Sequence, residues 1–107
     1  MKNQKIIKKI ISYIDAVLKY TDNITYDEFQ NNNMMVEACV FNLSQIGELT
    51  NKLDKEYMNE HSDIPWFKIK GLRNRIVHDY EGVNLKLIWE IIDRDIKILR
   101  EQLLKIF

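Results

Sequence analysis

The stretch IIKKIISYIDAVL, residues 6–18, has the pattern of an amphipathic helix. Its apolar residues recur every three or four positions, so they fall on one side of a helix that turns by about 100° per residue. Charges at Lys8, Lys9 and Asp15 interrupt every apolar run, so we expect an ordinary helix rather than a signal peptide. The spacing predicts this helix over residues 3–20. Its apolar stripe is Ile6, Ile7, Ile10, Ile11, Ile14, Val17 and Leu18.

A second helical pattern begins after residue 24. Thr25 and Glu28 have the spacing of a capping box, in which each side chain accepts a hydrogen bond from an otherwise unpaired amide. Beyond the polar residues 31–33 the helical period continues to about Tyr57, which predicts one long helix with an irregular beginning. The residues that share its inner face are Met35, Ala38, Cys39, Asn42, Ile46, Leu49 and Leu53.

The segment NEHSDIPWF, residues 59–67, ends that period. Ser62 or Asp63 is expected to be the N-cap of a third helix, with Pro65 in its first turn. Gly82 and Asn84 supply the stop of this helix and the start of a fourth. The stripe of the fourth helix is Leu85, Ile88, Ile92, Ile96, Leu99 and Leu103.

Four helices with short connections predict an all-α fold, an antiparallel four-helix up-down bundle in one domain over residues 1–107. Some helices have more than one apolar edge, as Val40 and Phe41 show in the second and Ile98 in the fourth. Two interpretations of these wide faces stay open, a generous core and burial against a second subunit.

The composition excludes several classes of protein. Lys plus Arg and Asp plus Glu both number 16, so an anionic partner must be bound by a local patch. No run approaches the roughly 20 apolar residues that span a bilayer, and we expect a soluble, cytoplasmic protein. The single cysteine, Cys39, excludes an intrachain disulfide and is interpreted as a buried small hydrophobe. Glu60, His61 and Asp63 have no metal-ligand spacing, so we expect a solvated loop and no metal or cofactor.

The clearest local patch lies in the third helix. Residues 64–78 contain no acidic residue, but they include Lys68, Lys70, Arg73 and Arg75. These cations predict a phosphate-binding surface, with a merely hydrated helix face as the alternative. The aromatic residues 66 and 67 either stack on unpaired bases or belong to the core.

The helical geometry of GLRNRIVHDY, residues 71–80, raises a difficulty. His78 falls opposite the apolar face, one turn after Asn74, whereas Arg73 and His78 are about 140° apart. A single straight helix therefore does not aim both side chains at one small target. Either the helix ends or bends before His78, or two copies of the stretch meet in a dimer. The positions expected to point inward are Ile69, Leu72, Ile76 and Tyr80.

Arginine and histidine together suit the cleavage of RNA. A histidine can take the proton of a ribose 2′-hydroxyl or protonate the leaving 5′-oxygen, and a guanidinium can stabilise the charge that develops on phosphorus oxygens. This chemistry needs no metal. The spacing R-x-x-x-x-H alone is not specific, because it arises often by chance.

Residues 73–80, RNRIVHDY, resemble the R-x-x-x-x-H-x-Y motif of the HepT branch of the HEPN superfamily, and IKGLRNRIVHDYEGVN and NLSQIGEL are similar to the same family. The resemblance implies a helical homodimer that acts as a metal-independent endoribonuclease, the toxin of a toxin-antitoxin pair. It implies that Arg73 and His78 are catalytic and that Asn74 supports them. Lys68, Lys70 and Arg75 are the residues expected to bind RNA.

The resemblance also implies a protein partner. The antitoxin of this family is a minimal nucleotidyltransferase that transfers AMP from ATP to the motif tyrosine, which Tyr80 matches. A modified tyrosine must be accessible, so we expect the helix to end near His78. For Glu48 we expect only a packing or dimer role. The alternative function is a non-catalytic helical adaptor, or a nucleotide-binding partner of a nucleotidyltransferase.

Overall fold

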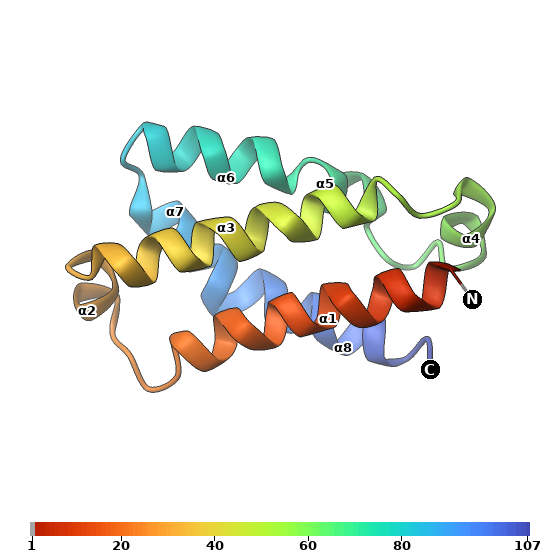
Figure 1. Cartoon of the computed structure of the whole chain (residues 1–107), viewed down its shortest axis with the longest axis horizontal. Coiled ribbons are helices and arrows are strands. Elements are labelled where there is room, and N and C mark those ends of the chain that lie inside the picture. Colours follow the sequence, from red (N-terminus) through yellow and green to blue (C-terminus); the bar gives the residue numbers. More distant parts are fainter. Residues whose placement is uncertain (1) are drawn as a thin grey trace.

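A computed structural model describes residues 2–107, and within them every regular element is a helix. The all-α prediction is therefore confirmed for this range. In Figure 1, α3 lies lengthwise between α1 and α6, and it packs against both. None of the helices in residues 2–107 has the length and apolarity needed to cross a membrane. The elements are α1 (Lys2–Tyr20), α2 (Tyr26–Gln30), α3 (Asn33–Thr50), α4 (Lys55–Glu60), α5 (Trp66–Lys70), α6 (Leu72–Glu81), α7 (Leu85–Glu90), η1 (Ile91–Asp95) and α8 (Ile96–Leu104).

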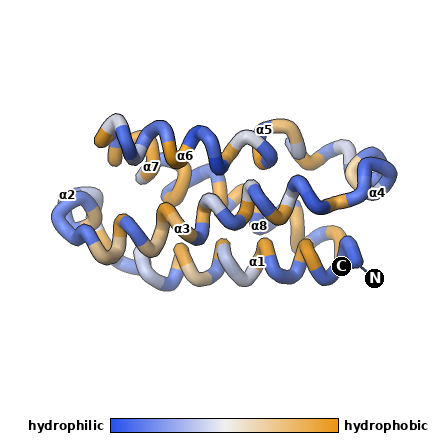
Figure 2. Tube along the Cα trace, turned by 45° about the horizontal axis from the view of Figure 1, so that its top comes forward, coloured by the Kyte–Doolittle hydropathy of each residue, from blue (hydrophilic) through white to orange (hydrophobic). Residues whose placement is uncertain are grey.

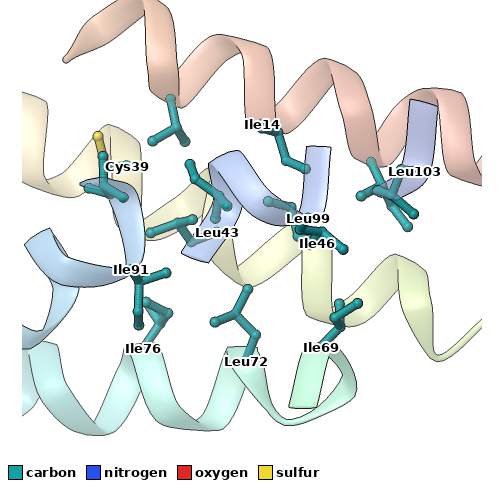
Figure 3. Close-up of a cluster of buried hydrophobic side chains, with 14 of the residues drawn as sticks. Ile14, Cys39, Leu43, Ile46, Ile69, Leu72, Ile76, Ile91, Leu99 and Leu103 are labelled. Atoms are coloured by element: carbon teal, nitrogen blue, oxygen red, sulfur yellow. The ribbon is translucent and has the colours of Figure 1, made fainter. Parts of the chain in front are cut away.

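The core lies where the apolar stripes of α1, α3, α6 and the C-terminal helices meet, as Figure 3 shows. Figure 2 shows hydrophobic and hydrophilic residues alternating along these helices with the helical period. Ile14, Leu43, Ile46 and Ile76 are all fully buried. Full burial of one such side chain is worth about 1.5–3 kcal/mol, so these stripes hold the helices together.

The second predicted helix is divided into three. The capping box is present, with Glu28 N donating to Thr25 Oγ1 at 3.2 Å and Thr25 N donating to Glu28 Oε1 at 3.0 Å. However, α2 ends at Gln30, and α3 begins anew because the Asn32 side chain accepts the amide hydrogen of Met35 at 3.0 Å. Asparagine side chains compete with the helical backbone in this way. The long helix to Tyr57 is thus wrong, since α3 ends at Thr50 and α4 follows.

The third predicted helix starts later and ends later than expected. Its first residue is Trp66, with Pro65 rather than Ser62 or Asp63 at the N-cap position, and Gly71 separates α5 from α6. The expected end near His78 is wrong, because α6 continues to Glu81 and the Gly82 amide donates to His78 O at 2.9 Å. The residue with left-handed backbone that follows is Val83, at φ 55°, and not Gly82.

The fourth predicted helix is continuous but changes its winding. α7 passes into η1, a π-helical turn, and then into α8. The predicted stripe is confirmed, because five of its residues are buried and Leu85 is half-buried. The apolar residues outside the main stripes differ in burial: Ile91 is buried, whereas Phe41 is 58% exposed and Ile98 is 54% exposed. The core of one chain therefore does not take up all of the wide apolar faces.

Candidate functional site

The polar residues of the motif lie on the outer side of α6. Leu72 and Ile76 anchor this helix in the core, and the side chain of His78 is 89% exposed. Arg73 and Asn74 are also exposed. Because α6 is an uninterrupted helix from Leu72 to Glu81, Arg73 and His78 leave it in directions about 140° apart. A helix that ends or bends before His78 is therefore excluded, and of the two predicted explanations only the dimer is left.

Arg73 is held by Glu48, for which only a packing or dimer role is expected from the sequence. Its Nε lies 2.9 Å from Glu48 Oε1 on α3, and the two side chains are about half exposed. Its Nη1 donates to Asn74 Oδ1 at 3.4 Å, so Asn74 lies beside Arg73 as expected. The stretch IGEL contained Glu48, but only tertiary packing shows that its carboxylate contacts the guanidinium.

Gly47 makes this contact possible. A Cβ at position 47 would lie 2.8 Å from the backbone N of Arg73 and 3.4 Å from Ile69 O. Real Cβ atoms do not approach backbone that closely, so only glycine lets α3 come this near to α6. The neighbouring Glu48 is thereby brought within reach of Arg73.

His78 has a carboxylate beside it. Its Nδ1 lies 3.6 Å from Asp79 Oδ1, and Asp79 is buried, with 6% of the residue exposed. Asp79 Oδ2 has no hydrogen-bond partner among the described residues. A buried polar atom without a hydrogen bond is costly, so Asp79 is a strained neighbour of the motif histidine. Sequence reasoning missed Asp79, because a single acidic residue next to a histidine carries no signal of burial.

The exposure of Tyr80 falls between the two predictions for it, an inward-facing ring and an accessible one. It belongs to α6 and occupies the edge of the inward face, yet 37% of it is exposed. The expectation of a buried ring is therefore wrong, although the helix does not end before it. Tyr80 is two residues from His78, so the phenol and the imidazole lie near the same end of α6.

The predicted RNA-binding residues lie on two elements. Lys68 and Lys70 belong to α5 and Arg75 to α6, on the flank away from Glu48, where its Nη1 lies 3.9 Å from Asp95 Oδ2. Trp66 is buried, and its Nε1 donates to the carbonyl groups of residues 58 and 61 at 3.0 Å each. Phe67 is 91% exposed. The two neighbouring aromatic residues thus divide between core and surface.

Cys39 and His61 are the other residues considered as a nucleophile and as a metal ligand, and the structure shows what surrounds each of them. Cys39 is buried in the core, and this burial raises the pKa of its thiol to about 12. The ring of His61 packs against that of Tyr57 at a tilt of 54°, with the ring centroids 4.7 Å apart. In residues 2–107 no three side chains of His, Cys, Asp or Glu gather as metal ligands would.

The chain is similar to known proteins over most of its length. The family described as Ribonuclease HepT-like matches residues 10–106. The chain belongs to this family. HepT-like membership makes it an endoribonuclease, which decides against the non-catalytic adaptor.

Relatives of this HepT-like chain cover almost all of its length. "Putative RNase TTE0752" of Caldanaerobacter subterraneus subsp. tengcongensis is 32% identical over 100 residues, which are 94% of this chain and 89% of the relative. "Putative RNase MJ0125" of Methanocaldococcus jannaschii is 31% identical over 97 residues, 91% and 84% of the two chains. "Probable ribonuclease HepT" of Thermococcus cleftensis is 24% identical over 94 residues, 88% and 86%. No solved structure matches the chain significantly.

Proposed function

We propose that this HepT-like chain is the ribonuclease toxin of a cytoplasmic toxin-antitoxin pair and cleaves RNA as a homodimer, without a metal. Each protomer is a single-domain antiparallel up-down four-helix bundle. One observation carries the proposal: Arg73 and His78 are both exposed on the unbroken helix α6, at an angle that one copy cannot aim at one phosphate. A two-fold axis brings a second Arg73 and a second His78 to the same cleft.

Exposed apolar residues on α3 support the proposal that a second copy covers this side of the protein. Met34 is 83% exposed and Phe41 is 58% exposed. Met34, Phe41 and Glu48 follow one another at intervals of seven residues, which is about two helical turns, so they line one side of α3. Glu48 in turn contacts Arg73, so this apolar stripe continues into the motif.

The proposed reaction is the attack of a ribose 2′-oxygen on the adjacent phosphorus. One His78 accepts the proton of the 2′-hydroxyl, and the second His78 donates a proton to the 5′-oxygen as its bond to phosphorus breaks. The products are a 2′,3′-cyclic phosphate and a 5′-hydroxyl. Arg73, kept in place by Asn74 and Glu48, stabilises the negative charge on the non-bridging oxygens. Lys68, Lys70 and Arg75 bind the backbone on either side.

Neutralisation is proposed to occur at Tyr80. The Tyr80 oxygen attacks the α-phosphate of ATP in a minimal nucleotidyltransferase, pyrophosphate leaves, and the phenolic proton is released. The partial exposure of Tyr80 supports this role. An adenylyl group at this end of α6 adds a negative charge and bulk near the proposed cleft, so it repels and blocks RNA.

Cleavage of RNA in the presence of EDTA tests the proposed chemistry. We expect the wild type to produce cyclic phosphate ends, and His78→Ala and Arg73→Ala to lose about 10²–10⁴ in rate. The chain has two histidines, so His61→Ala is the matched control and should retain activity. Light scattering should give a dimer for every variant. Equal cleavage by the wild type and His78→Ala would contradict the assignment.

Mass spectrometry after incubation with the nucleotidyltransferase and ATP tests the neutralisation. The wild type should gain one AMP and lose activity, whereas Tyr80→Phe should gain none. Tyr20, which is exposed on α1, gives the matched control Tyr20→Phe. Neutralisation without an adduct on Tyr80 would show that inhibition occurs by complex formation instead.

A further inference from the structure

A groove runs along the flank of α6 that faces away from Glu48. It has a volume of about 620 Å³ and lies between α5 and α6 on one side and η1 and α8 on the other. Its volume is in the range of sites that take small ligands, about 300–1,000 Å³. The side chains that matter for its chemistry are Phe67, Lys68, Arg75, Arg94, Asp95 and Ile98.

The charges of the groove favour an anion. Its lining includes three cationic side chains, Lys68, Arg75 and Arg94, and one carboxylate, Asp95. Asp95 lies 3.9 Å from Arg75 and 3.3 Å from Arg94, and both arginine side chains remain at least half exposed. A guanidinium has five N–H donors, so one shared carboxylate leaves most of them free for phosphate oxygens.

A second cavity of similar size shows that this charge is particular to the groove. That cavity, of about 590 Å³, lies between α1 and the C-terminal helices. Its lining includes four acidic residues and two basic ones, so it repels a polyanion. In a chain with no net charge, the groove beside α6 thus differs from the second cavity in the sign of its charge and not in its size.

Phe67 gives the groove an aromatic wall. It is 91% exposed, while the preceding Trp66 is buried and fixed by two hydrogen bonds from its indole nitrogen. The anchored Trp66 sets the orientation of the first turn of α5, which turns Phe67 toward solvent. An exposed phenyl ring among cations is the combination that binds unpaired bases, because the ring stacks and the cations hold the backbone.

One residue of the groove lies one helical turn from the motif histidine. Arg75 and His78 are three residues apart on α6, so their side chains are neighbours on its surface. Opposite them, the π-helical turn of η1 carries Arg94 and Asp95. π-Helical turns are rare in proteins, and those that do occur are often found at functional sites. Arg75, which lines the groove, is therefore the residue that links it to the motif histidine.

We propose that this groove is a subsite for one unpaired nucleotide of the RNA next to the cleaved bond. Its base stacks on Phe67, and Arg75, Arg94 and Lys68 hold the adjoining phosphates. The subsite rests on the proposed ribonuclease function and deepens it. It implies that the protein selects RNA that is single-stranded at this position, because a paired base cannot stack on Phe67.

Binding of a 2′-O-methyl oligoribonucleotide of mixed sequence tests the subsite apart from catalysis, because a blocked 2′-oxygen cannot attack. By fluorescence anisotropy, Phe67→Ala should weaken binding about tenfold, and Phe67→Trp should restore it. Phe107→Ala is the matched control, because Phe107 is an exposed ring that does not line the groove, and this variant should bind as the wild type does.

The charge is tested in the same assay. Arg94→Gln should weaken binding several-fold and reduce the slope of log Kd against log salt by about 0.7, the value for one lost phosphate contact on a single strand. Lys97→Gln, in the acidic cavity, should change neither quantity. An oligonucleotide with abasic positions should bind equally to the wild type and Phe67→Ala.

Three outcomes separate this subsite from the proposed function. Unchanged RNA binding by Phe67→Ala, together with cleavage that depends on His78, overturns the subsite alone. Weakened binding by Phe67→Ala in a protein that does not cleave RNA supports the subsite and overturns the chemistry. If Phe67→Ala instead changes only the mass of the oligomer or the affinity for the nucleotidyltransferase, the groove binds protein, and the subsite is also overturned.

Discussion

Glu48 Oε1 lies 2.9 Å from Arg73 Nε and so joins α3 to the motif helix α6. The two side chains are about half exposed, and ion pairs of this kind contribute only about 0–1 kcal/mol to stability. The consequence of the contact is therefore orientation. The carboxylate occupies Nε and Asn74 accepts one hydrogen bond from Nη1, which leaves the other N–H groups of the guanidinium to bind a phosphate.

Glu48→Ala should impair catalysis more than folding. Without the carboxylate Arg73 loses its fixed direction, so we expect kcat to fall about 10- to 100-fold with little change in KM. Glu48→Gln keeps an oxygen that accepts the Nε–H, so it should retain most of the activity. Thermal unfolding should shift little in either variant. A wild-type kcat for Glu48→Ala would show that Arg73 does not need this contact.

Gly47→Ala should destabilise the protein because its Cβ would lie 2.8 Å from Arg73 N, which forces α3 and α6 apart. We expect a loss of about 1–3 kcal/mol in the free energy of unfolding, measured in urea, despite the better helix propensity of alanine. Gly71→Ala is the control, since its Cβ would meet only carbonyl oxygens at 3.7 Å. Equal stability of the two variants would mean that the helices can separate without cost.

Val83→Gly should stabilise the fold. Val83 has φ 55° and is 77% exposed, so its β-branched side chain gains little from packing in a conformation that it rarely adopts. The left-handed region costs an ordinary residue about 1–2 kcal/mol, and the flexibility of glycine offsets part of the gain. A net gain of about 0.5–1 kcal/mol in urea unfolding is expected. A less stable variant would show that the turn does not hold this strain.

Cys39 should be inert in the folded protein. Burial raises the pKa of its thiol to about 12, against about 8.5 in an unfolded chain. At pH 8 a thiol reagent should therefore react only after denaturation. Because the folded pKa is the higher one, the stabilisation is complete below pH 8.5 and is lost as the pH rises toward 12. Between pH 7.5 and 9.5 the wild type should lose about 1 kcal/mol more stability than Cys39→Ala.

Helix breaks were the least predictable part of the fold. Apolar spacing predicted the inner face of every long helix, including the stripe of α7 to α8. The breaks at residues 31–32 and after Thr50 depend on other contacts. Asn32 caps α3, and Asp54, before α4, contacts Lys2 and Asn3 at the start of α1. The cap of α3 is thus local, whereas side chains from a distant part of the sequence help to set where α4 begins.

The sequence by itself determined the all-α class, the buried faces of the helices, the outward position of Asn74 and His78, and the motif that marks the family. These features are local, because helical periodicity and motif spacing depend on residues only a few positions apart. The tertiary structure decided which groups surround the motif. It brought Glu48 to Arg73, left Phe67 in solvent beside the buried Trp66, and placed Arg94 across the groove from Arg75. Those contacts depend on how closely separate helices pack, which no local pattern records.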